Sequence, residues 1–277
     1  MPAQPPVVYV YGIVATVPEA GSVEGPSVLS GATFGPPRFL SFGRFTAVVS
    51  DLTLRQGASL NALLENCGNA ESLILQHHRV LQGLSDKQSV LPFRLGVMFN
   101  DDQGVLGALA RNRDALCEVM EQIDDAVEWG LKIYCARDRL ARLLADKAPK
   151  IVALKAEIDA AGEGRAFFLL RRRERLVEEA VEQATMQCLK HTGKQLESVV
   201  RSLAFGRLHR AEEHGREGQM VFNGACLVSR GRKRAFFELV EDLRGAYSES
   251  GFDHEITGPW PPYSFADYQL GGDEHAA

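Results

Sequence analysis

A chain of 277 residues with 45% hydrophobic and 24% charged residues has the composition of a globular protein of about two domains. Its 31 basic and 36 acidic residues give a net charge of −5, which is too mild an imbalance to attract nucleic acid over the whole surface. Five scattered cysteines without a C-x-x-C pair argue against a disulfide framework or a zinc knuckle. No basic residue precedes Arg38, and the first apolar run is short, so we expect neither a secretory signal nor a membrane span but a cytoplasmic protein.

The first predicted element is a strand over Val7–Val14, whose β-branched and aromatic residues on both faces are typical of a buried central strand. Residues 17–37 are rich in Gly, Pro and Ser and predict a long loop. The stretches 38–42 and 45–50 flank Gly43 and Arg44, a spacing that indicates a β-hairpin.

The rest of the first half predicts helices and two more strands. Residues 58–85 have helical spacing, and 89–99 form a strand in which Pro92 indicates an edge position or a bulge. A helix capped by Asp101 or Asp102 follows, and a strand over 127–134 comes next. The apolar stripe of that helix consists of Val105, Leu109, Leu116, Met120 and Ile123. This order predicts a modified ferredoxin-like domain over 1–136, with helices packed on an antiparallel sheet.

The second half predicts a helix-rich α+β domain over 137–277. No strand is expected between 136 and 208, where an apolar stripe from Leu169 to Cys188 indicates one long helix after Gly162 and Gly164. A buried strand over 220–228, a helix through Phe236 and Tyr247 and a short strand over 252–257 complete the domain. The last residues are expected to form a flexible tail.

Local catalytic signatures are absent from the sequence. It contains no P-loop, no G-x-G-x-x-G, no H-E-x-x-H and no G-x-S-x-G, so we expect no catalytic residues, no cofactor and no metal. The only histidine pair, His77 and His78, projects in directions about 100° apart on a helix, which disfavours joint metal binding. His77 lies on an apolar stripe, where a structural role is favoured.

One single arginine and one cluster of four arginines could contact partners. Arg94 lies in an apolar stretch, where a buried ion pair is the favoured interpretation and an anion or partner contact is the alternative. Arg171, Arg172, Arg173 and Arg175 could bind an acidic partner, but neighbouring glutamates favour a self-paired, solvated helix face.

The segment Gly258–Phe265, GPWPPYSF, is termed the C-terminal strap. Its three prolines predict a stiff, extended segment that presents Trp260, Tyr263 and Phe265 at defined angles. We expect these aromatic residues to clamp the strap onto the second domain, with Trp260 buried there, and docking of a partner is the alternative.

Four segments resemble motifs of the gas vesicle protein F/L family. They are Tyr9–Val14 (YVYGIV), Val90–Phe99 (VLPFRLGVMF), Glu128–Tyr134 (EWGLKIY) and the C-terminal strap. Leu95 and Cys226 depart from the family pattern, which commonly has aromatic residues there. The resemblance covers nearly the whole chain.

The resemblance implies a non-enzymatic accessory or minor structural component of the gas vesicle. Its partners would be the small hydrophobic shell protein and other accessory proteins, and its role would be to limit aggregation of the shell protein during nucleation. Two alternatives start from the residues themselves. One is an anion- or small-molecule-binding enzyme on ferredoxin-like domains, and the other is an RNA-binding module, for which no basic-aromatic signature is present.

Overall fold

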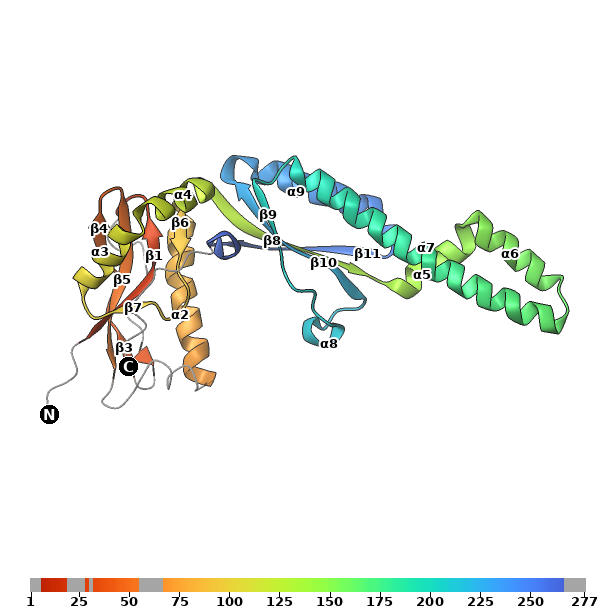
Figure 1. The fold of residues 1–277 in the computed structure, drawn as a ribbon, viewed down its shortest axis with the longest axis horizontal. Helices are drawn as coiled ribbons and strands as arrows, with labels where there is room; N and C mark the ends of the chain where they lie inside the picture. Colours follow the sequence, from red (N-terminus) through yellow and green to blue (C-terminus); the bar gives the residue numbers. More distant parts are fainter. Residues whose placement is uncertain (1–5, 19–27, 30–31, 55–66, 267–277) are drawn as a thin grey trace. The chain divides into compact units, whose positions relative to one another are not determined.

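The computed structural model describes residues 6–18, 28–29, 32–54 and 67–266 (Figure 1). The chain forms two compact units: the first comprises Met1–Glu128 and Pro259–Ala277, and the second comprises Trp129–Gly258. The boundaries thus fall inside two strands, whereas the sequence predicted one boundary at residue 136. Most of the C-terminal strap groups with the first unit, because its contacts are made there. The predicted flexible tail, 267–277, lies outside the described residues.

The first unit is built on a seven-stranded sheet, in which five strands follow the order β2-β3-β5-β1-β6, while β4 pairs with β5 and β7 pairs with β1. Strand β1 (Val7–Val14) is buried between β5 (Phe45–Leu54) and β6 (Val90–Pro92), as its apolar sequence predicts. Strand β4 (Arg38–Phe42) forms the predicted hairpin with β5, and Gly43 has a φ of 56° in the turn. Strands β2 (Val28–Leu29) and β3 (Ala32–Phe34) lie within the predicted loop, and β3 pairs with β5.

The predicted strand over 89–99 is two strands separated by a turn. Both β6 and β7 (Met98–Phe99) pair antiparallel with β1, and Gly96 has a φ of 92° between them. The side-chain-free Gly96 permits this left-handed conformation, so the chain leaves the sheet and returns. Pro92 ends the edge strand β6, in agreement with the predicted edge position.

Among the described residues, three helices accompany the sheet of the first unit: α2 (Cys67–Ser85), α3 (Asp102–Arg111) and α4 (Arg113–Ile123). Residues 58–66 of the predicted first helix lie outside the described residues. The Asp101 side chain caps α3 by accepting a hydrogen bond from Gly104 N–H. The predicted single helix is interrupted at Asn112, but all five residues of its predicted stripe are buried. The short 3-10 helix η3 (Tyr263–Phe265) lies at the end of the strap.

The second unit is built on a four-stranded sheet with the order β11-β8-β10-β9. Its strands are β8 (Ala126–Cys135), β9 (Ser202–Phe205), β10 (Gln219–Ser229) and β11 (Phe252–Trp260). The prediction of no strand before residue 208 was wrong, because β9 pairs antiparallel with β10. The first part of β10 alternates buried and half-buried residues, so it is not buried on both faces as predicted.

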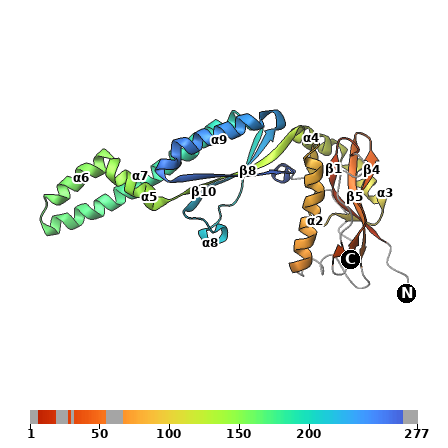
Figure 2. The same ribbon diagram turned by 180° about the vertical axis from the view of Figure 1, so that it is seen from behind.

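Helices cover one face of this sheet and extend beyond it. Helices α9 (Lys233–Tyr247) and the second half of α7 (Glu163–Glu197) lie along that face (Figure 2). The first half of α7 packs against α5 (Arg137–Lys147) and α6 (Pro149–Asp159). The shorter elements are α8 (Ala211–His214), η1 (Arg230–Arg232) and η2 (Ser248–Ser250). The core contains Trp129, whose ring meets Phe237 edge-on at 4.9 Å between centroids.

Candidate functional site

The C-terminal strap presents two aromatic side chains on the first unit. Pro261 and Pro262 are buried, whereas Trp260 is 37% and Tyr263 38% exposed. Phe265 is half-buried. The strap is extended as far as Trp260, where β11 ends, and then turns into η3. The prediction of an extended segment therefore holds for its first part only.

His78 on α2 is the residue against which the strap aromatics lie. Its ring centroid is 5.4 Å from that of Trp260 and 6.1 Å from that of Tyr263. Its Nδ1 lies 3.1 Å from the Tyr263 hydroxyl oxygen, at hydrogen-bond distance. These contacts hold the strap on the first unit, so the expectation that Trp260 packs into the second domain was wrong.

Glu128 fixes the end of the strap by accepting two hydrogen bonds from Ser264. The Ser264 N–H donates to Glu128 Oε2 at 2.8 Å, and the Ser264 hydroxyl donates to Oε1 at 2.9 Å. Burial raises the pKa of Glu128, and the two hydrogen bonds from Ser264 oppose that shift. Burial, together with the Glu128 carboxylate, also raises the pKa of Tyr263.

Trp260→Ala is expected to cost the first unit about 1 to 2 kcal/mol, because the ring is partly solvated and its removal leaves no closed cavity. Thermal unfolding followed by circular dichroism measures this cost. In a Trp129→Phe background, Trp260 fluorescence should be red-shifted by water. A loss of 3 kcal/mol or more, with blue-shifted emission in that background, would contradict the partly exposed position.

His77 has the predicted structural role. The Tyr9 hydroxyl lies 2.8 Å from His77 Nδ1, and His77 Nε2 lies 3.2 Å from the carbonyl oxygen of Phe93. Since a carbonyl only accepts, Nε2 carries the proton and Nδ1 accepts from Tyr9. Burial lowers the pKa of His77 to about 4. His77 and His78 point to different partners, so they do not act as a metal-binding pair.

Arg94 is exposed, and the favoured interpretation of a buried ion pair was wrong. It follows Phe93, whose N–H bonds to Tyr11 O, at the point where the chain leaves the sheet for the turn at Gly96. The side chain is therefore outside the core despite the apolar sequence around it. The alternative interpretation, contact with an anion or a partner, stays a proposal.

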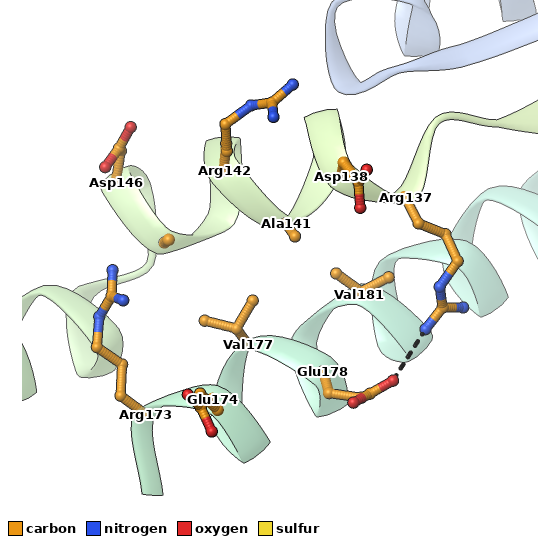
Figure 3. Close-up of a pocket in the computed structure, with 11 residues that line it drawn as sticks. Arg137, Asp138, Ala141, Arg142, Asp146, Arg173, Glu174, Val177, Glu178 and Val181 are labelled. Carbon is orange, nitrogen blue, oxygen red and sulfur yellow. Dashed lines mark hydrogen bonds and ion pairs between the residues drawn. The ribbon is translucent and has the colours of Figure 1, made fainter. Parts of the chain in front are cut away.

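A groove of about 630 Å³ lies between α5 and α7 in the second unit (Figure 3). Ala141, Val177 and Val181 give it apolar surface, and charged residues of both signs surround them. Arg137 donates to Glu178 across the groove at 3.3 Å, as the dashed line shows. The residues that line the groove are arginine, aspartate, glutamate, alanine and valine, so it offers charged and apolar contacts.

Large apolar side chains are exposed on several elements. Phe167 (57%) and Phe168 (74%) lie near the start of α7, and Phe205 (75%) ends β9. A contiguous patch of exposed apolar side chains marks a site of protein interaction. The sequence analysis did not single out any of the three: Phe205 lies in an unpredicted strand, and the two phenylalanines belong to an amphipathic helix whose buried face was inferred from Leu169.

Within the described ranges, no group of three or more His, Cys, Asp or Glu residues is arranged to hold a metal ion. In the same ranges, no helix is both long and apolar enough to cross a membrane.

The model of the family "Gas vesicle synthesis protein GvpL/GvpF" matches residues 7–267. This chain belongs to the GvpL/GvpF family. A gas vesicle protein L from Streptomyces sp. is 34% identical over 268 residues, which cover 93% of this chain and 92% of that protein. Gas vesicle protein F1 from Halobacterium salinarum is 23% identical over 266 residues, covering 96% and 95% of the two chains.

Solved structures of GvpF proteins share the fold. The GvpF crystal structure from Anabaena sp. has a TM-score of 0.66 at 16% identity and covers 95% of this chain and 97% of its own. That from Microcystis aeruginosa has a TM-score of 0.62 at 17% identity, with coverage of 95% and 99%. The family resemblance drawn from the four motifs and the mixed α+β fold class are thus confirmed.

Proposed function

We propose that this GvpL/GvpF protein is a non-enzymatic accessory or minor structural protein of gas vesicle assembly in the cytoplasm. It binds the small hydrophobic shell protein, and other accessory proteins, and limits shell-protein aggregation during nucleation. The observation that carries the proposal is the family match from residue 7 to residue 267, with a relative at 34% identity over almost the full chain. The proposal includes no nucleic-acid partner and no membrane span.

Strand β9 is the surface that suits an extended apolar chain. It forms one edge of the second sheet, and its sequence, Ser-Leu-Ala-Phe, contains no charge and no proline. Natural proteins protect exposed edges with charges or proline, because an open edge pairs with other strands. An apolar segment of the shell protein would add beside β9, with Phe205 as its first apolar contact.

The opposite edge of the same sheet, β11, carries those protections. Arg216 pairs with Asp253 at 2.8 Å and with Glu255 at 3.4 Å, and Pro259 lies near the end of the strand. Strand β11 therefore has charged side chains and a proline that oppose strand addition, whereas β9 has neither. This contrast favours β9 as the edge to which a strand is added.

The alternative, an anion- or small-molecule-binding enzyme, loses its support in the described residues. It was motivated by Arg94 and by the histidine pair. Arg94 is exposed, His77 is engaged with Tyr9 and Phe93, and His78 lies against the strap.

Phe205→Lys is expected to reduce capture of the shell protein at least about tenfold, because a charge on an open edge opposes strand addition. A pull-down with the purified shell protein measures this effect. Ile74→Lys is the matched control, since Ile74 is also exposed (53%) but lies on α2 of the first unit. Equal capture by both variants would reject β9 as the binding surface. Normal flotation of a vesicle-forming host that lacks the gene would reject the assembly role itself.

A further inference from the structure

A regular stripe of six side chains runs along the solvent face of α7. Its members are spaced four, three, four, three and four residues apart, which places them on one helix face in the pattern of a coiled-coil seam. All six are exposed, and Phe168 at one end is 74% and Met186 at the other end 52% exposed. The stripe consists of Phe168, Arg172, Arg175, Glu179, Glu182 and Met186.

The order of residue types along the stripe makes it complementary to a second copy that runs in the opposite direction. It reads apolar, basic, basic, acidic, acidic, apolar. In an antiparallel pair of α7 helices with the two-fold axis at residue 177, Arg172 faces Glu182 of the second copy and Arg175 faces Glu179. A parallel pair would instead place arginine on arginine and glutamate on glutamate, which costs free energy.

The same register brings the apolar ends together. Phe168 of one copy then lies over Met186 of the other, a contact between an aromatic ring and a thioether. A hollow of about 330 Å³ opens beside Met186, and Leu189, Leu208 and Met220 are among its lining residues. A benzyl group is small enough to enter it, so the hollow offers apolar surroundings for Phe168, the most exposed large apolar side chain among the described residues of α7.

Contacts within one copy leave the stripe available. Arg175 and Glu179 approach at 3.9 Å, and both side chains remain more than half exposed. Arg172 and Glu182 have no ion-pair partner among the residues that the structure describes. The predicted self-paired helix face therefore holds for Arg171, which meets Glu174 at 3.2 Å, and for Arg175, but it does not account for Arg172 or Phe168.

We propose that the protein associates with a second copy of itself through this α7 stripe, as an antiparallel, two-fold symmetric pair of helices. The paired length is about 28 Å for 19 residues, so the interface is small and the association depends on protein concentration. The charge pairs fix orientation and register more than they add affinity, and salt weakens them. The proposal concerns self-association and is independent of binding to the shell protein.

Charge reversal on the full-length chain tests the proposal by sedimentation equilibrium at low and high salt. Arg172→Glu is expected to weaken the dimer at least about tenfold, because the symmetric interface then holds two like-charge contacts. Glu182→Arg should do the same. The double variant R172E/E182R recreates both pairs with reversed sense and should return the dissociation constant to within about threefold of wild type.

Lys155→Glu is the matched control, because it makes the same charge change at an exposed position on α6, outside the stripe. It should leave the dissociation constant unchanged, whereas Phe168→Ala should weaken the dimer. Wild-type protein that stays monomeric over the concentration series would overturn the proposal. So would a double variant that remains as weak as the single variants.

A distance measurement separates the antiparallel pair from other dimers. With Cys67 and Cys117 replaced by serine, a spin label at Gln187, which is exposed on α7 but outside the stripe, should lie about 30 Å along the helix from its symmetry mate, and one at Gln183 about 18 Å. A parallel pair would give about 10 Å at both positions. Short distances at both sites would overturn the proposed geometry even if the protein is dimeric.

Discussion

Trp129→Ala is expected to lower the free energy of unfolding of the second unit by about 4 kcal/mol. Trp129 is only 4% exposed, and its ring packs edge-on against Phe237 and at 6.4 Å from Phe236. Truncation removes this buried area and leaves a cavity beside α9 that the sheet cannot close. Urea unfolding followed by far-ultraviolet circular dichroism measures the loss.

Trp129→Phe is the control for that experiment. The Trp129 indole N–H has no hydrogen-bond partner among the described residues, so phenylalanine removes no hydrogen bond and keeps an aromatic ring. Its cost should be about 1 to 2 kcal/mol. Wild-type stability of Trp129→Ala would show that the aromatic cluster does not hold the second unit together.

Stability of the first unit is expected to fall by about 3 kcal/mol as the pH falls from 6.5 to 4. Burial lowers the pKa of His77 to about 4 in the folded protein, against about 6.5 in the unfolded chain. Between these values the unfolded state binds a proton that the folded state does not. The stability that neutral His77 contributes is therefore fully present above pH 6.5. It is lost as the pH falls toward 4, where both states become protonated.

His77→Gln tests this assignment, since glutamine does not titrate but can still accept from Tyr9 and donate to the Phe93 carbonyl. The variant should lose most of the pH dependence in this window. The pKa of His78, which also lies in the first unit, is lowered by burial, and His78 accounts for part of what remains. If the variant and the wild type show the same pH profile, His77 is not the responsible group.

Elements with strong local patterns were predictable from the sequence. The β-branched run at Val7–Val14 gave β1 with its bounds, and Gly43 between two apolar stretches gave the β4-β5 hairpin. The spacing of Phe236, Val240 and Leu243 gave α9 and its buried face. In each case the residues that decide the structure are neighbours in sequence.

Features decided by long-range contacts were not predictable. Strand β9 has four residues, too few for a periodic signal, and it exists because β10 pairs with it. The docking of the strap on α2 depends on His78 and Glu128, which lie 185 and 136 residues from Tyr263 and Ser264 in the chain. Arg94 was misjudged because the chain leaves the sheet between β6 and β7, at the turn that contains Gly96, inside an apolar stretch.

The central claim is that this GvpL/GvpF protein binds the shell protein and limits its aggregation. Light scattering of purified shell protein, diluted from denaturant with and without the full-length chain, measures that activity directly. The account predicts that scattering falls in proportion to added chain until the two proteins are near equimolar, and that Phe205→Lys protects less well than Ile74→Lys. Unchanged scattering at a molar excess of the wild-type chain would contradict it.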